Sequence, residues 1–145
     1  MTSDQPTAID RLTFTGLSKR GARRVIQRAF VLVGRERAIR QHLREVELNT
    51  HWWVEDWNLE WTVLLDHGRV EFHRGHVGKA QVNYLWQTGE GFLRHIETKS
   101  APEEGFQSAG DPVWRRVVDP VFTAFLAELR EVLADPVDDG GIRLL

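Results

Sequence analysis

Residues 51–86 decide the fold class of this chain: HWWVEDWNLEWTVLLDHGRVEFHRGHVGKAQVNYLW. They hold five of the six tryptophans and the single tyrosine, and most of the stretch alternates between two kinds of side chain. Alternation with a period of two is typical of strands that bury one face. Turn residues at Asp66–Gly68 and Gly75–Gly78 interrupt it. We therefore expect four strands, at 48–57, 59–66, 69–74 and 80–86.

The segments on either side of this stretch are helical by pattern. Apolar residues recur at spacings of three and four over 18–46, with Ser18 as the N-cap and an interruption at Gly34. Residues 88–99 form a further expected helix, and Ser100 opens a short one that contains Phe106. Two Asp-Pro pairs predict helix starts at 112 and 120, giving two short helices or one kinked helix up to 134.

These segments predict a single α+β domain. Because short turns join the strands, we expect an antiparallel meander of four or five strands, covered on one face by the N- and C-terminal helices. Residues 1–17 are expected to be a loose arm, 18–134 the domain, and 135–145 a frayed C-terminal tail. The 145 residues fit one domain with a real core.

Composition excludes several classes of protein. The chain has no cysteine, so it has neither disulfides nor thiolate metal sites. Its N-terminus lacks the pattern of a signal peptide, and no apolar run approaches the ~18 residues of a membrane span. We expect a cytoplasmic, bacterial protein without a cofactor.

A basic segment precedes the strands. Residues 18–46 carry nine basic and two acidic side chains, a net charge of +7, and the remainder of the chain is then −9. A solvated helix face that pairs with acidic residues elsewhere is the simpler interpretation. The alternative is contact with an anionic membrane surface through Arg20, Arg23, Arg24 and Arg28. The segment lacks a groove-reading module, so nucleic acid is not an expected partner.

Two patterns raise the question of chemistry at polar residues. Glu71 and His73 share one strand face and His76 follows in the turn, a set that suits zinc or iron. That face lies opposite Val70 and Phe72 and is expected to be solvated, so we interpret these histidines as surface residues and expect no metal site.

Aspartates offer the second pattern. Small α+β cones of the ketosteroid isomerase and polyketide cyclase type use an Asp or His inside an apolar pocket, and Asp56, Asp66 and Asp119 are candidates. Asp66 lies in a turn signal and Asp119 in a helix-capping position, and both roles explain an aspartate without catalysis. The chain also lacks phosphate-binding loops and nucleophile elbows. A cyclase or isomerase is therefore the alternative function.

Aromatic side chains are the stronger candidates for function. Trp52, Trp61 and Tyr84 share the expected inner face of the sheet with other rings, and four phenylalanines lie on segments expected to cover it. Such a set forms either a filled core or an apolar cavity with aromatic walls. As walls of a cavity we select eight residues: Trp61, Val63, Phe72, Tyr84, Trp86, Phe92, Phe122 and Phe125.

Three motifs resemble the sterol carrier protein type-2 family. WTVLLDHGRV at 61–70 resembles the central hairpin of that family. QVNYLW at 81–86, followed by TGEGFL, resembles its next strand and the helix after it, and PEEGF at 102–106 resembles its short helix. The resemblance covers roughly residues 45–110. It implies a tunnel between sheet and helices that binds fatty acyl chains, sterols or other lipids. One departure is that the family follows the short helix with a further strand, where Gly110–Arg116 here indicates a helix start.

The expected function is thus non-enzymatic binding or transfer of a small apolar or amphipathic ligand. An interaction or regulatory module without a ligand is a third possibility. It predicts a close-packed interior and an exposed apolar or basic patch. A cyclase or isomerase predicts instead a buried ionisable group with a shifted pKa at the floor of a pocket.

Overall fold

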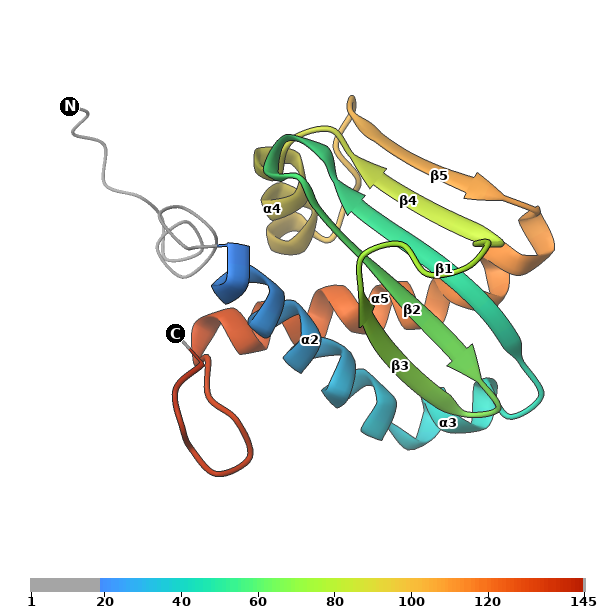
Figure 1. The fold of residues 1–145 in the computed structure, drawn as a ribbon, viewed down its shortest axis with the longest axis horizontal. Coiled ribbons are helices and arrows are strands. Elements are labelled where there is room, and N and C mark those ends of the chain that lie inside the picture. The colour runs from blue at the N-terminus through green and yellow to red at the C-terminus, as the bar shows by residue number, and fades with distance from the viewer. Residues whose placement is uncertain (1–18, 145) are drawn as a thin grey trace.

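The computed structural model describes residues 19–144, which form one sheet with helices packed on it (Figure 1). In chain order the elements are α2 (Lys19–Arg35), α3 (Arg37–His42), β1 (Glu47–Val54), η1 (Glu55–Trp57), β2 (Leu59–Asp66), β3 (Arg69–Arg74), β4 (Val82–Trp86), α4 (Gly89–Thr98), β5 (Phe106–Gly110) and α5 (Pro112–Ala134). The expected arm at 1–17 and the cap Ser18 lie outside the described residues. The α+β class, with helices from both ends of the chain against one sheet, is confirmed.

The sheet is mixed rather than a simple meander. Its strand order is β3-β2-β1-β4-β5. β1 pairs with β2, β2 with β3 and β4 with β5 in antiparallel fashion, but β4 lies parallel to β1. The expectation that β4 pairs with β3 is therefore wrong.

Polar side chains on the outer face of the sheet bind the segment that connects β3 to β4. The segment after β3 runs back across β2 and β1 to reach the far edge of β1 (Figure 1). Thr62 Oγ1 donates to the Gly75 carbonyl at 2.8 Å and accepts from the Val77 amide at 3.0 Å. Asn49 Nδ2 donates to the Val77 carbonyl at 2.7 Å. These hydrogen bonds provide partners for backbone groups of the β3–β4 connection, which is longer than a tight turn.

A fifth strand replaces the short helix that was expected to contain Phe106. β5 pairs with β4 so that Phe106 lies opposite Trp86 and Gly110 opposite Val82. The Phe106 ring packs on Trp86 at 5.1 Å and on His95 at 4.9 Å between centroids. Tertiary contact with these rings outweighs the local capping pattern. A strand that the local pattern did not predict is therefore present at residues 106–110.

One helix covers the C-terminal part of the chain. Asp111 caps the start of α5, its carboxylate accepting from the Val113 amide at 2.8 Å, and the helix continues from Pro112 through Pro120 to Ala134. Of the two expected alternatives the structure has the single helix, and no second helix starts at Asp119. Proline lacks one amide donor there, but the apolar face of α5 stays packed on the core. Asp119 is consequently not a helix cap. The N-terminal helices separate at Glu36, two residues beyond Gly34.

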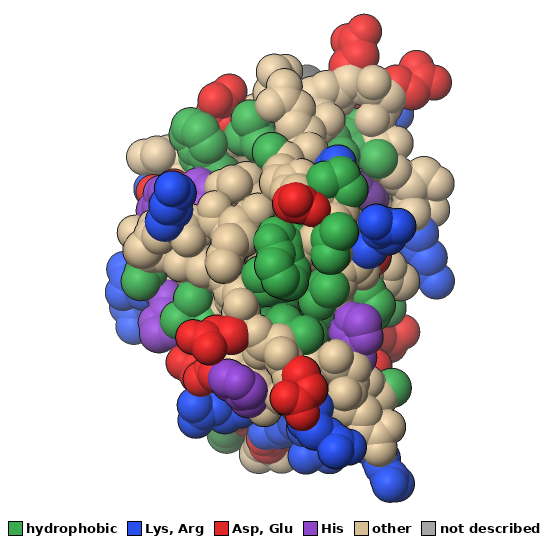
Figure 2. All heavy atoms as spheres, turned by 90° about the vertical axis from the view of Figure 1, so that its right-hand side faces the viewer, with side chains coloured by type: hydrophobic (Ala, Val, Ile, Leu, Met, Phe, Trp, Pro, Cys, Tyr) green, Lys and Arg blue, Asp and Glu red, His purple; other side chains and the backbone are tan. Residues whose placement is uncertain are grey.

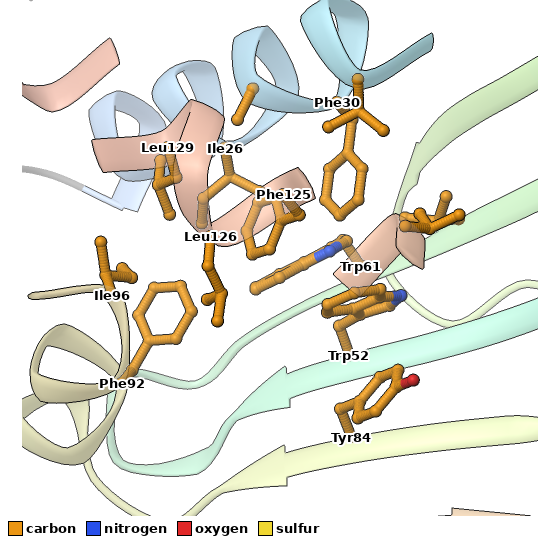
Figure 3. Packing of buried hydrophobic residues seen from close by; sticks show 14 of the residues in the cluster. Ile26, Phe30, Trp52, Trp61, Tyr84, Phe92, Ile96, Phe125, Leu126 and Leu129 are labelled. Carbon is orange, nitrogen blue, oxygen red and sulfur yellow. The ribbon is translucent and has the colours of Figure 1, made fainter. Parts of the chain in front are cut away.

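The helices all lie against the same face of the sheet, and the core fills the layer between them (Figures 1 and 3). From α2 the core receives Ala22, Val25, Ile26, Ala29, Phe30 and Val33, the apolar face that the spacing predicts. From α5 it receives seven buried residues, among them Phe125, Leu126 and Leu129.

Candidate ligand-binding site

The eight selected wall residues all lie in or against the layer between sheet and helices. Trp61, Val63, Tyr84, Trp86, Phe92 and Phe125 are buried there. Phe72 and Phe122 are half-buried and pack against the same cluster. The strand alternation and the helix spacing thus bring these side chains together as expected, while their role toward a ligand remains a prediction.

Rings of the protein itself occupy much of this layer. Trp52 lies at its centre, within 6.3 Å between centroids of Trp61, Tyr84, Trp86 and Phe122. Phe30 stacks on Phe125 at 4.3 Å and meets Trp52 edge-on at 5.2 Å (Figure 3). A ligand that entered here would have to displace some of these rings.

Trp52 and Phe30 belong to the same cluster but were not selected as walls. Trp52 lies on the central strand β1, opposite Trp61 on β2 and Tyr84 on β4, so it touches rings from both sides. Trp52 is two positions from both Thr50 and Val54, and this spacing already placed it on the inner face. Its central position depends on the parallel pairing of β1 with β4, which local periodicity does not reveal.

A cleft on the surface lies beside this aromatic layer. It has a volume of about 400 Å³ and lies between the β4–β5 edge of the sheet and the first turns of α5. Tyr84, Ser108, Pro112, Arg115, Arg116 and Asp119 line it. Tyr84 connects the two regions, because its ring packs on Trp52 and on Phe122, each at 4.6 Å between centroids. The volume lies within the range of small-molecule sites.

Tyr84 has an unusual environment for a tyrosine. The side chain is only 4% exposed, and within the described residues its hydroxyl has no hydrogen-bond partner. Burial raises the pKa of this hydroxyl, the Asp119 carboxylate raises it further, and Arg115 partly opposes the shift. The hydroxyl is therefore protonated at neutral pH and available as a donor.

The outer surface beside the cleft carries both apolar and charged side chains. Val113 and Trp114, on the first turn of α5, are 54% and 42% exposed. Figure 2 looks onto the side of the molecule where β5 ends and α5 begins, and it shows apolar side chains gathered near its middle with charged ones around them. Arg116 is exposed on the same turn of the helix. The sequence pattern did not reveal this surface, because it indicated only a helix start for these residues.

A second cleft, of about 430 Å³, is slightly larger but lies away from the selected walls. Its lining is Glu47, Leu48, Asn49, Leu64, Leu65, Asp66, Glu71 and Gln81. Three of these are carboxylates, which suits an apolar ligand poorly. The cleft beside Tyr84 is therefore the better candidate for an apolar or amphipathic molecule.

The histidines on the outer face contact neighbouring side chains there. His76 stacks on His51 at 4.2 Å between ring centroids, and His51 Nε2 lies 2.8 Å from a Glu60 carboxylate oxygen. His73 Nε2 lies 3.6 Å from Glu71. Across residues 19–144 no group of three or more His, Cys, Asp or Glu side chains is arranged to hold a metal ion.

Two of the three candidate aspartates have structural roles. Asp56 Oδ1 accepts from the Gly89 amide at 2.7 Å. Asp66 pairs with His67 at 2.7 Å and with Arg69 at 2.9 Å in the β2–β3 turn. These hydrogen bonds lower the pKa of the Asp66 carboxyl and raise that of the His67 imidazole. Asp119 alone of the three lines the cleft beside Tyr84.

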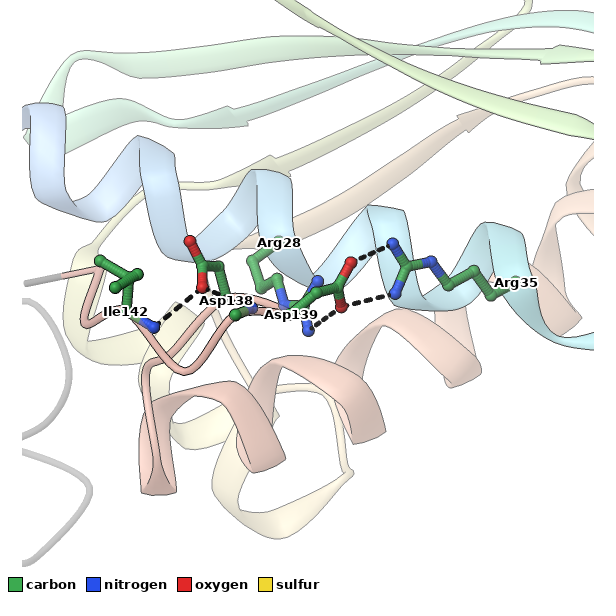
Figure 4. Close-up of polar contacts among 6 residues, drawn as sticks. Arg28, Arg35, Asp138, Asp139 and Ile142 are labelled. Carbon is green, nitrogen blue, oxygen red and sulfur yellow. Dashed lines mark hydrogen bonds and ion pairs between the residues drawn. The ribbon is translucent and has the colours of Figure 1, made fainter.

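The basic segment is partly neutralised by the C-terminal residues (Figure 4). Asp139 receives hydrogen bonds from both terminal nitrogens of Arg35 and pairs with Arg28 at 2.9 Å. Residues expected to fray instead turn back, with Val137 bridged to Arg143 and Leu144 packed against the core. Arg28 is thereby engaged within the protein, and Arg20 and Arg24 are exposed. Among helices in the described part of the chain, none is long and apolar enough to cross a membrane.

Comparison with known proteins gives structural similarity alone. No model of a known protein family matches the sequence, and no curated protein does. Among solved structures, a conserved hypothetical protein from Thermus thermophilus, described as a possible sterol carrier protein, aligns over 74% of this chain and 85% of its own. The TM-score is 0.51 at 13% identity. The chain has a sterol carrier protein type-2-like fold.

Two further solved structures are similar to this chain at a TM-score of 0.45. The UbiJ-SCP2 ubiquinone synthesis protein is 14% identical, with 68% of this chain and 90% of its own covered. The inverting sec-alkylsulfatase Pisa1 from a Pseudomonas species is 16% identical, and the match covers 57% of this chain. It covers only 13% of the much longer alkylsulfatase.

Proposed function

We propose that this protein binds or carries a small apolar or amphipathic molecule, such as a lipid, a fatty acyl chain or a sterol, without catalysing a reaction on it. The supporting observation is the cleft of about 400 Å³ whose floor, Tyr84, packs directly on the aromatic layer. The fold, shared with a possible sterol carrier protein, agrees with such a role. The polar rim and the apolar floor suit a molecule with one polar end.

The proposed path into the interior passes Phe122. Its ring is half-buried, stacks on Trp52 at 5.5 Å and packs on Tyr84 at 4.6 Å. Moving this ring aside would open the layer lined by Trp61, Val63, Phe72, Tyr84, Trp86, Phe92 and Phe125. Each methylene transferred there from water contributes about 0.8 kcal/mol, so an acyl chain of medium length would bind at micromolar strength.

Displacement of a fluorescent fatty acid, an anthroyloxy-labelled stearate, tests the proposal. We expect the labelled stearate to bind and palmitate to displace it. Phe122→Ala should change the affinity for the labelled stearate at least about threefold, because the substitution removes the ring between the cleft and the interior. Val31→Ala, at an exposed position of α2, is the matched control and should bind as the unaltered protein does. The proposal is wrong if neither displacement nor native mass spectrometry detects a bound molecule.

Contact with an anionic membrane surface is a further part of this proposal. Arg20, Arg23 and Arg24 lie on the first turns of α2, and Arg28 follows one turn later. Arg28 already pairs with Asp139, and Arg23 is half-buried beside Arg74, so Arg20 and Arg24 are the strongest candidates. Sedimentation with phosphatidylglycerol vesicles should weaken in the Arg20→Gln/Arg24→Gln double variant. Sedimentation equal to that of the unaltered protein would contradict this contact.

The third possibility, an interaction module, is favoured by a different observation. The interior is densely occupied by rings, and Val113 and Trp114 form an exposed apolar pair on the first turn of α5. Exposed apolar side chains of this size are common at sites of protein contact. Failure of every lipid to bind, together with self-association or partner binding that Trp114→Ala abolishes, would support this function instead.

A further inference from the structure

Two hydrogen-bond donors that lack acceptors belong to residues that line the cleft beside Tyr84. The Tyr84 hydroxyl and Arg115 Nε are both buried, and neither has a partner among the described residues. Buried donors in folded proteins are almost always paired, with protein or with another molecule. Two unpaired donors from different elements, β4 and α5, that line one cleft therefore indicate that an acceptor belongs there.

The guanidinium groups of the cleft are only partly engaged. Arg115 makes one long bond, from Nη1 to the Ser108 hydroxyl at 3.3 Å. Within residues 19–144 Arg116 forms no ion pair, and the Asp119 carboxylate forms none either. The three charged groups of the lining leave a net charge of +1. Arginine presents a planar set of donors that matches the oxygens of a carboxylate or a phosphate.

We propose that the cleft binds the acidic head group of an amphipathic ligand, a carboxylate or a phosphate monoester. The head group accepts hydrogen bonds from Tyr84 Oη and Arg115 Nε and lies beside the Arg116 guanidinium. The apolar chain continues past Tyr84 toward Phe122 and Trp52, where the aromatic layer begins. This inference rests on the proposed function for the chain of the ligand, and it adds the chemistry of its polar end.

Asp119 opposes such a head group and so limits the affinity. Its carboxylate lines the same cleft and repels an anion. Removing its charge should therefore strengthen binding, whereas removing a donor should weaken it. Opposite effects from neighbouring side chains of one cleft distinguish a head-group site from nonspecific association.

Binding of four probes tests the inference: octyl phosphate, octanoate, 1-octanol and inorganic phosphate. The alkyl chain is nearly the same in the first three, so their relative affinities report on the head group. We expect both acids to bind at least about tenfold more tightly than octanol, since hydrogen bonds to a charged group are worth more than neutral ones. Inorganic phosphate, which has no chain, should bind at least about tenfold more weakly than octyl phosphate.

Variants assign the preference to the cleft. Tyr84→Phe and Arg116→Gln should each lower the ratio of acid to octanol affinity about tenfold, and Asp119→Asn should raise it. Tyr84→Phe removes only an unpaired hydroxyl, so the variant is expected to fold. Arg37→Gln removes one positive charge from an exposed position on α3, and it should leave the ratio unchanged. Circular dichroism confirms that each variant is folded before binding is measured.

Three outcomes would overturn the inference. Binding of octanol as tight as that of the acids would mean that no head-group site exists. Equal effects of Arg116→Gln and Arg37→Gln would place the attraction in the overall charge rather than in the cleft. Equal binding of inorganic and octyl phosphate would indicate a site for a free anion.

Nuclear magnetic resonance separates this inference from the proposed function. A shift of the Arg115 Nε–H signal with octyl phosphate or octanoate supports the head-group site directly. If that shift occurs while labelled stearate fails to bind, the site stands and binding of a long chain in the interior is wrong. If labelled stearate binds without a preference for acids and without the shift, interior binding stands and the head-group site is wrong.

Discussion

At the scale of single residues, His95 shows how burial controls an ionisable side chain. It lies on α4, only 4% exposed, with its ring near Phe106 and Phe122. The Trp86 indole Nε1–H donates to His95 Nδ1 at 3.1 Å, which requires a neutral imidazole with Nδ1 as the acceptor. Burial lowers the pKa of His95, so the folded protein favours this neutral form.

Acidification should therefore destabilise the protein through His95. Below a pH of about 6.5 the unfolded chain binds a proton at this residue that the folded protein resists, so stability falls as the pH falls. Between pH 7.5 and 5.5 the loss from one such histidine is at most about 1.4 kcal/mol. Urea unfolding at the two pH values should show a smaller loss for His95→Asn, whose amide oxygen can replace Nδ1.

His67 serves as the opposing control. Its hydrogen bond to Asp66 raises its pKa, so its contribution is present at low pH and is lost as the pH rises above its folded pKa. His67→Asn should make the loss of stability on acidification larger, the opposite of His95→Asn. Equal pH dependence in the unaltered protein and in His95→Asn would show that His95 does not stay neutral in the folded state.

At the scale of elements, the junction of β5 with α5 determines the shape of the cleft. Gly110 ends β5 with φ of +130° and lies opposite Val82. A Cβ atom at this position would overlap the Gln81 carbonyl oxygen, closer than atoms of folded proteins approach. Only glycine lets the chain pass so near the start of β4 and then turn into Asp111 and α5.

Gly110→Ala should lower the free energy of unfolding by about 2 to 4 kcal/mol, through the strained backbone and the clash with Gln81. Urea denaturation measures the change. Gly140→Ala is the matched control, since a Cβ there meets nothing closer than 3.5 Å. A loss no greater than that of the control would mean that β5 and β4 approach less closely than in the structure.

At the scale of the whole molecule, the C-terminal segment ties the end of the chain back to α2. Asp139 bridges Arg28 and Arg35, which lie two turns apart on that helix (Figure 4). Asp138 accepts from the Gly140 and Ile142 amides and shapes the intervening loop. The hydrogen bonds from both arginines hold the pKa of the Asp139 carboxyl well below its usual range.

Asp139→Asn should release this segment. Amide hydrogen exchange should become faster at Ile142 and Leu144, and the effect should shrink at high salt, where the unaltered ion pairs are already screened. In the unaltered protein the same release should occur as the pH falls through the folded pKa of Asp139, because the paired carboxylate must then be protonated. Glu90→Gln, which breaks an exposed pair with Arg94 on α4, should leave exchange at these amides unchanged.

The sequence by itself determined the class of fold and most of the interior. Local periodicity shows which side chains share one face of one element. It correctly placed Trp61, Tyr84, Trp86 and the apolar face of α2 in the interior. It also placed Asp66 in its turn, because turn residues act through their own backbone.

Only the tertiary structure decided how these faces meet. The parallel pairing of β1 with β4, the strand at Phe106 and the continuation of α5 through Pro120 all depend on partners distant in the sequence. So does the cleft, which joins Tyr84 on β4 to Arg115 and Asp119 on α5. Local patterns report the conformation of a segment, whereas a site made of several segments depends on the packing that brings them together.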